Sequence, residues 1–312
     1  MSRFEYHEPD SVAEAIDLVD RHGDTARFLA GGTDLLIQIR HGRLTPRHLV
    51  NLHRVPGLAE IAANGTISIG ARVTHRTIER HHAFQGDLRA LVEGARVVGG
   101  HQIRNVGTVG GNIVNASPAA DLVPPLLALD AAVTLLGPDG DRTLALDGFA
   151  SGPGVTARRP QELLMRVTFP APPPRSATAF LKAGRRRAME ISVVCVAVRL
   201  TLDRALERCV EARIALGAVA PTALRARAAE RALEGQVADA SAFQRAGLLA
   251  VDACAPISDV RASAAFRRHL VVTLVARALA IARSRATREG GAAGRTGAGA
   301  PASEATSDEG AS

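Results

Sequence analysis

Two segments of the sequence combine paired glycines with hydroxyl, amide and carboxyl side chains. The first runs from Ala30 to Leu35 and the second from Gly107 to Asn112. Glycine has no Cβ and readily adopts positive φ, so such a loop lets amide N–H groups converge on an anion. Thr108 adds a hydroxyl and Asn112 an amide group. Two such segments in one chain predict a ligand with two phosphates, which means a dinucleotide.

Asp121 lies a short distance after the second segment. At that spacing a carboxylate suits the hydroxyls of a sugar better than a phosphate. Ordinary turns are the alternative for either segment alone, because Gly-Gly pairs are common in turns. Neither segment fits G-x-x-x-x-G-K-[ST], or G-x-G-x-x-G followed by an acid, so a P-loop ATPase and a standard Rossmann dehydrogenase are disfavoured.

The sequence resembles the FAD-binding (medium) subunit of the molybdenum hydroxylases, the xanthine dehydrogenase and aerobic carbon monoxide dehydrogenase type. The order and spacing of the matching motifs agree from residue 3 to residue 285. The motifs occupy residues 30–35, 102–112, 115–122, 182–186 and 191–194.

The resemblance implies which residues contact FAD. Backbone amides of the first segment would hold one part of the diphosphate, the second segment would hold the other, and Asp121 would bind a sugar hydroxyl. Val98 stands where some relatives have an aromatic side chain against the isoalloxazine, so we expect ring stacking to be lost. No catalytic or metal-ligating residue is predicted. The predicted FAD contacts are Leu29, Ala30, Gly31, Gly32, Thr33, Asp34, Leu35, Val98, Thr108, Gly110, Gly111, Asn112, Asp121, Leu164 and Lys182.

The resemblance also implies a fold and an electron-transfer role. The fold would be α+β, a two-lobed FAD-binding fold of the vanillyl-alcohol-oxidase type followed by a C-terminal domain of small antiparallel sheet and helical bundle. FAD would receive electrons from two [2Fe-2S] clusters of a small subunit and pass them to NAD⁺, a quinone or dioxygen. A large subunit with a molybdenum-pterin cofactor would hydroxylate the substrate, in a dimer of heterotrimers.

Lys182 is the only lysine among the 38 basic residues of the chain. In a sequence so biased toward arginine, one retained lysine indicates a place that a planar guanidinium cannot fill. A compact ammonium near the flavin ring or its phosphates would explain it, and chance survival is the alternative. Arg104, within the second motif, could contact a phosphate or partner, or form a structural ion pair.

The resemblance implies two FAD-binding lobes, lobe 1 (residues 1–55) and lobe 2 (56–174), before a C-terminal domain (175–286) and a tail (287–312). Helical and strand patterns alternate up to a proline-rich break at residues 170–174, where we place the boundary before the C-terminal domain. Two strand-like runs and three helical patterns follow the break. The tail is rich in Gly, Ala, Ser and Thr, so we expect it to be disordered.

Composition excludes several classes of protein. The net charge of +7 comes from scattered basic residues, and with no Trp and one Tyr a nucleic-acid stacking platform is disfavoured. Cys195, Cys209 and Cys254 lack the spacing of a zinc or iron–sulfur site. No apolar targeting segment follows Met1 and no apolar run is long enough to span a bilayer, so we expect a cytoplasmic protein.

Two other functions remain open at this stage. A free-standing flavoprotein oxidase of the same superfamily would need a substrate base and often a covalent flavin, but neither glycine segment contains His or Cys. A nucleotide-binding regulatory or assembly protein without redox activity would keep the glycine segments but need not keep Lys182.

Overall fold

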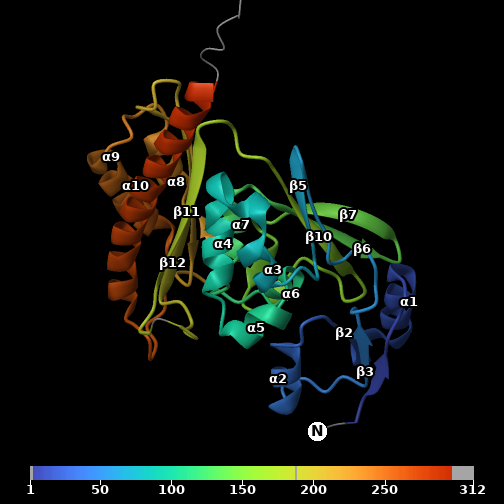
Figure 1. Ribbon diagram of the computed structural model, residues 1–312. Coiled ribbons are helices and arrows are strands. Elements are labelled where there is room, and N and C mark those ends of the chain that lie inside the picture. The colour runs from blue at the N-terminus through green and yellow to red at the C-terminus, as the bar shows by residue number, and fades with distance from the viewer. Residues whose placement is uncertain (1–2, 187, 297–312) are drawn as a thin grey trace, which may run out of the picture.

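The computed structural model describes residues 3–186 and 188–296, and three groups of elements follow one another along the chain (Figure 1). Lobe 1 contains a small parallel sheet, lobe 2 an antiparallel sheet with several helices, and the C-terminal domain a second antiparallel sheet with three helices. The helices of lobe 2 lie between the two antiparallel sheets, since α4 packs against β11 and α7 against β12 and β13.

The sheet of lobe 1 has the strand order β1-β3-β2, all parallel. Helix α1 covers one face and buries Ala15, Ile16 and Val19. Ser11 caps this helix, its side chain accepting from the Glu14 amide, as the sequence predicts. The elements are β1 (Glu5–His7), α1 (Val12–His22), the 3-10 helix η1 (Gly23–Thr25), β2 (Ala26–Leu29), α2 (Leu35–Arg40) and β3 (His48–Asn51).

Lobe 2 has a five-stranded antiparallel sheet in the order β4-β5-β10-β6-β7. Ile69, Val133 and Val167 from its central strands are fully buried against the helices. The elements are β4 (Ile61–Asn64), β5 (Thr66–Gly70), α3 (His75–Arg80), η2 (His82–Phe84), η3 (Gly86–Leu88), α4 (Arg89–Arg96), α5 (His101–Val106), α6 (Val109–Val114), α7 (Val123–Ala128), β6 (Ala132–Gly137), β7 (Gly140–Ala145), β8 (Ala150–Gly152), β9 (Val155–Thr156) and β10 (Leu163–Pro170).

The C-terminal sheet has the order β11-β12-β13-β14 and is antiparallel throughout. Helices α8 to α10 cover the face turned away from lobe 2 (Figure 1). Strand β12 is buried along its whole length because both of its faces are covered, which explains its continuous apolar run. The elements are β11 (Ser176–Ala183), β12 (Val194–Leu202), β13 (Cys209–Gly217), β14 (Leu224–Arg225), α8 (Arg227–Leu233), α9 (Ala240–Ala250), η4 (Val251–Ala253) and α10 (Ala264–Thr296).

The predicted fold class is confirmed, with three local differences. Strand β11 was not expected, because Ser176–Ala183 follows the proline-rich break and has no clear alternation of polar and apolar residues. The second glycine segment is not a loop: Gly107 and Thr108 join α5 to α6, and its other residues lie within α6. Helix α10 continues to Thr296, into the expected tail. Residues 297–312 of that tail lie outside the described residues.

Asp130 joins lobe 2 to the C-terminal sheet. Its backbone has a φ of 54°. Its carboxylate accepts from Arg199 at 3.2 Å, from Arg213 at 2.9 Å and from Arg225 at 2.6 Å. Burial alone would raise the pKa of Asp130, but hydrogen bonds from Arg225 and Arg213 lower it below its ordinary value. Arg199, which interrupts the apolar run of β12, is therefore buried as an ion-pair partner.

Gly247→Ala tests the contact between α9 and α10. A Cβ at this position would lie 2.6 Å from the carbonyl oxygen of Val272, so α10 would have to shift. We expect the free energy of unfolding to fall by about 1–3 kcal/mol, measured by urea denaturation.

A loss of stability would indicate the close contact with α10, because a Gly to Ala change inside an unobstructed helix instead adds roughly 1 kcal/mol of stability. The control is Gly152→Ala in β8, where a Cβ meets nothing within 4 Å. A Gly247→Ala chain as stable as this control would contradict the close contact.

Candidate functional site

A cavity of about 760 Å³ lies where the two lobes and the C-terminal domain meet. This volume is in the range of small-molecule and cofactor sites. All but two of the predicted FAD contacts line it, and the exceptions are Leu29 and Lys182. The lining members of that set are Ala30, Gly31, Gly32, Thr33, Asp34, Leu35, Val98, Thr108, Gly110, Gly111, Asn112, Asp121 and Leu164.

The first glycine segment brings the backbones of the two lobes into contact. A Cβ on Gly31 would lie 1.9 Å from the carbonyl oxygen of Val106, so only glycine fits there. Gly32 has a φ of +69°, which only glycine adopts readily. Among the hydrogen bonds of the described residues, none is donated by the amides of Gly32, Thr33 or Asp34. These amides are therefore available to an anionic group in the cavity.

The amides of Gly110 and Gly111 in the second glycine segment are not free, although the sequence predicts a loop with free amides. The Gly110 amide donates to the carbonyl oxygen of Ala71 at 2.8 Å, and the Gly111 amide to Thr108 Oγ1 at 3.1 Å. A Cβ on Gly110 would lie 2.7 Å from the Cβ of Ala71. The expectation is wrong here: these glycines allow α6 to pack closely, and Thr108 acts as a helix cap.

Asn115 and Asp34 connect the two glycine segments through their side chains. Asn115 Nδ2 donates to Asp34 Oδ1 at 3.2 Å. Asn115 lies in the matching motif but is absent from the predicted contacts. It fixes the Asp34 carboxylate at the wall of the cavity.

Two buried side-chain atoms on the cavity wall have no hydrogen-bond partner among the described residues. They are His75 Nδ1 and Asn112 Oδ1. An unpartnered buried polar atom costs free energy, so this wall fits a polar ligand that supplies partners. Burial, with a smaller effect of Arg104, lowers the pKa of His75 to about 4, so the ring is neutral at neutral pH. No sequence motif singled out His75.

Lys182 lies directly behind the cavity wall and is one-tenth exposed. Its ammonium donates to Asp121 Oδ2 at 2.6 Å, to the Glu190 carbonyl at 2.8 Å and to the Val97 carbonyl at 3.3 Å. All three N–H donors are therefore used within the protein. This arrangement explains why position 182 holds a lysine. A planar guanidinium cannot point its N–H groups at three acceptors arranged around one atom.

The carboxylate of Asp121 is buried and accepts from two protein donors. Besides Lys182, Ser192 Oγ donates to Oδ1 at 2.5 Å. Burial raises the pKa of Asp121, while the Lys182 charge and the two hydrogen bonds act in the opposite direction. The predicted bond to a sugar hydroxyl must use the second lone pair of these oxygens.

The remaining candidates lie at the sides of the cavity. Val98 follows the end of α4, and Leu164 lies at an irregularity of β10 between Leu164 and Arg166. Arg104 forms an ion pair with Glu79 at 3.3 Å, so it is a structural residue. Met189 and Ile191, which were not predicted, close the side formed by the C-terminal domain.

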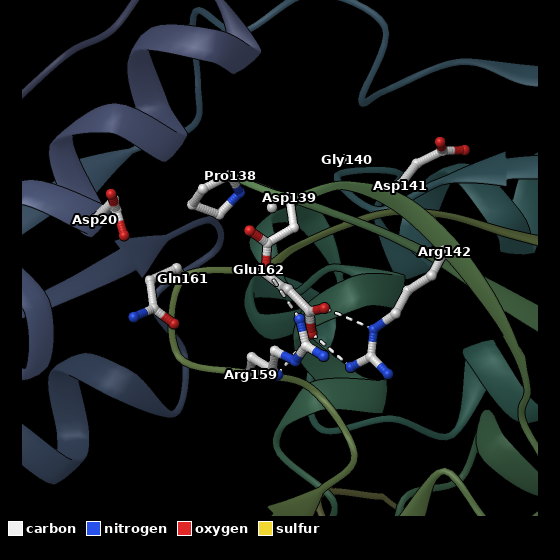
Figure 2. Close-up of a pocket in the computed structure, with 10 residues that line it drawn as sticks. Asp20, Pro138, Asp139, Gly140, Asp141, Arg142, Arg159, Gln161 and Glu162 are labelled. Carbon is white, nitrogen blue, oxygen red and sulfur yellow. Dashed lines mark hydrogen bonds and ion pairs between the residues drawn. The ribbon is translucent and has the colours of Figure 1, made fainter.

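A second hollow of about 400 Å³ lies beside the β6–β7 turn (Figure 2). Glu162 projects into it and accepts from Arg142 at 2.6 and 2.8 Å and from the Arg159 amide at 2.6 Å (Figure 2). The Glu162 carboxylate is therefore already paired within the protein.

Comparison with known families shows the family of the chain. Residues 2–172 match the family described as the FAD binding domain in molybdopterin dehydrogenase. Residues 179–282 match the CO dehydrogenase flavoprotein C-terminal domain. The chain belongs to the FAD-binding subunits of the molybdenum hydroxylases. It is an oxidoreductase subunit with FAD as its cofactor.

Individual relatives agree along nearly their whole lengths. The xanthine dehydrogenase FAD-binding subunit of Escherichia coli O157:H7 is 35% identical, over 86% of this chain and 92% of the relative. The carbon monoxide dehydrogenase medium chain of Afipia carboxidovorans is 35% identical, over 91% of this chain and 98% of the relative.

Solved structures of the family share the fold. Carbon monoxide dehydrogenase from Hydrogenophaga pseudoflava gives a TM-score of 0.87 at 35% identity, over 91% of this chain and 98% of that one. Quinoline 2-oxidoreductase from Pseudomonas putida 86 gives 0.84 at 31% identity, over 91% and 98%. Within residues 3–186 and 188–296 there is no helix with the length and hydrophobicity of a membrane span.

Lys182→Met tests the role of the ammonium in this flavoprotein subunit. The change leaves Asp121 buried beside only one donor, so we expect the free energy of unfolding to fall by about 3 kcal/mol. Asp121→Asn combined with Lys182→Met should cost less than the sum of the two single changes, in urea denaturation.

Arg21→Met is the matched control, because its ion pair with Asp17 is exposed and should contribute less than about 1 kcal/mol. If Lys182→Met were no more destabilising than this control, the buried pair would not hold the wall together.

His75 makes stability depend on pH. Its folded pKa of about 4 lies below its ordinary value of 6.5, so the unfolded chain binds the proton first as pH falls. Its effect on stability is absent above about pH 6.5 and grows to a loss of roughly 3 kcal/mol as pH falls to about 4. Unfolding of the His75→Gln variant should therefore vary less with pH across this window.

The control for this experiment is His101→Gln, which alters an exposed histidine. Identical pH profiles for wild type and His75→Gln would show that His75 is not buried as a neutral ring.

Proposed function

We propose that this chain receives electrons from [2Fe-2S] clusters of a small partner subunit and delivers them to NAD⁺, a quinone or dioxygen. The observation that carries the proposal is the cavity between the lobes, which combines free backbone amides, neutral polar side chains and an apolar side. FAD, when bound, takes up two electrons and two protons and returns them to an acceptor. A large molybdenum-pterin subunit would hydroxylate the substrate, in a cytoplasmic dimer of heterotrimers.

The residues of the cavity divide into two groups by their chemistry. The amides of Gly32, Thr33 and Asp34 suit the diphosphate, because amide dipoles stabilise an anion without a mobile counter-charge. Val98, Leu164 and Ile191 are apolar and suit the flavin ring. We propose that the ring lies on the side formed by lobe 2 and the C-terminal domain, where these residues offer apolar contacts.

Exposed apolar side chains on α2 and α5 support docking of a partner close to the cavity. Leu36 and Ile37 on α2 are 42% and 48% exposed, and Val106 on α5 is 49% exposed. The segment before α2 touches α5 through Gly31 and Val106. A contiguous exposed apolar patch marks an interaction site, and we propose that these side chains contribute to one.

The test is an absorbance spectrum of the purified chain, with the released cofactor identified by chromatography after denaturation. We expect stoichiometric, non-covalent FAD. Gly31→Ala should lose most of it, because a Cβ there collides with the Val106 carbonyl and separates the lobes. Gly152→Ala, which has open space around the new methyl group, should keep it.

Other results of the absorbance experiment would favour one of the two alternative functions. A covalently attached flavin would favour a free-standing oxidase, and a colourless chain that takes up no added FAD would favour a regulatory or assembly protein. The holo-subunit is reduced under anaerobic conditions and then mixed with NAD⁺, a soluble quinone or dioxygen in separate experiments, and the rate of flavin reoxidation identifies the acceptor. No reoxidation by any of them would overturn the electron-delivery role.

A further inference from the structure

Three histidines distant in sequence meet at one corner of lobe 1. They are His7 on β1, His22 at the end of α1 and His48 at the start of β3. One possible ligand atom of each lies within 4.8 Å of the others. None of the three lines either of the two hollows described above. The function proposed above does not use them.

The parallel pairing of β1 with β3 creates this cluster. Glu5 pairs with His48 in the register of the two strands. His7 lies two residues after Glu5, so both side chains point to the same face of the sheet. Helix α1 packs on this sheet and ends at His22. The fold therefore adds the Glu5 carboxylate to the three imidazoles.

The distances match the edges of a metal coordination sphere. His7 Nε2 lies 3.2 Å from His48 Nδ1, and Glu5 Oε2 lies 3.3 Å from His48 Nδ1 and 3.9 Å from His7 Nε2. Tetrahedral Zn²⁺ with bonds of about 2.0–2.1 Å places its ligand atoms about 3.3 Å apart. Two of the three edges already have this length.

His22 supplies the fourth ligand position. Its ring stacks on His48, with the centroids 3.7 Å apart and the planes 18° apart. Parallel rings do not point their lone pairs at one atom, so His22 must rotate to bind. The surroundings leave room for this, since all three histidines are only partly buried.

We propose that Glu5, His7, His22 and His48 bind one divalent transition-metal ion of the Zn²⁺ class. Imidazole nitrogens with one carboxylate select Zn²⁺ and its neighbours over Mg²⁺ and Ca²⁺, which prefer all-oxygen sites. The ion fastens the edge strand β1 and the end of α1 to β3. It therefore stabilises lobe 1 and takes no part in electron transfer.

The test is calorimetric titration of the FAD-loaded chain, made without a polyhistidine tag, with ZnCl₂ and with MgCl₂. We expect one Zn²⁺ per chain, no Mg²⁺, and a melting temperature that rises with Zn²⁺ concentration. His7→Gln combined with His48→Gln should weaken Zn²⁺ binding more than about tenfold, because loss of a ligand costs at least as much as loss of a supporting residue.

The control is His81→Gln combined with His82→Gln, which removes a second stacked histidine pair that belongs to no such cluster. It should leave Zn²⁺ binding unchanged. His22→Gln keeps the test informative if the first double variant fails to fold, and it too should weaken Zn²⁺ binding. No Zn²⁺ binding by the wild type, or equal binding by all variants, would overturn the proposal.

Discussion

The ammonium of Lys182 holds together the wall of the cavity between the lobes without lining that cavity. Its three acceptors belong to three wall segments: Asp121 lines the cavity, Val97 precedes Val98, and Glu190 lies between Met189 and Ile191. One compact cation of the C-terminal domain therefore links lobe 2 to that domain at the cavity wall. An ammonium suits this task, because its three N–H bonds diverge from a single atom.

The paired glycines do not act mainly by presenting free amides to an anion. Gly31 and Gly110 are required because backbone or Cβ atoms of another segment occupy the space of their side chains. Close packing thus accounts for two of the four paired glycines, and positive φ for Gly32. The same residues serve ligand binding only indirectly, because the packing they permit brings the free amides near Gly32 to the cavity.

The sequence predicted the fold class, and all of the predicted FAD contacts except Leu29 and Lys182 line the cavity, because the glycine motifs can be recognised in the sequence itself. It did not predict the partners of Lys182, since the carbonyls of Val97 and Glu190 look like any others until the chain is folded. His75 was missed because nothing near it in sequence shows its burial. The His7, His22 and His48 cluster was missed because strand pairing, rather than spacing, brings these residues together.

The contact between Gly31 and Val106, together with the bonds of Lys182, also bears on the order of events during folding. The cavity exists only when residues near 31, 106, 121 and 182 have all met, and these contacts are distant along the chain. Contacts with large sequence separation form late, because their loop-closure entropy must be overcome first. A ligand of this cavity would therefore meet a complete site only after these distant segments have come together.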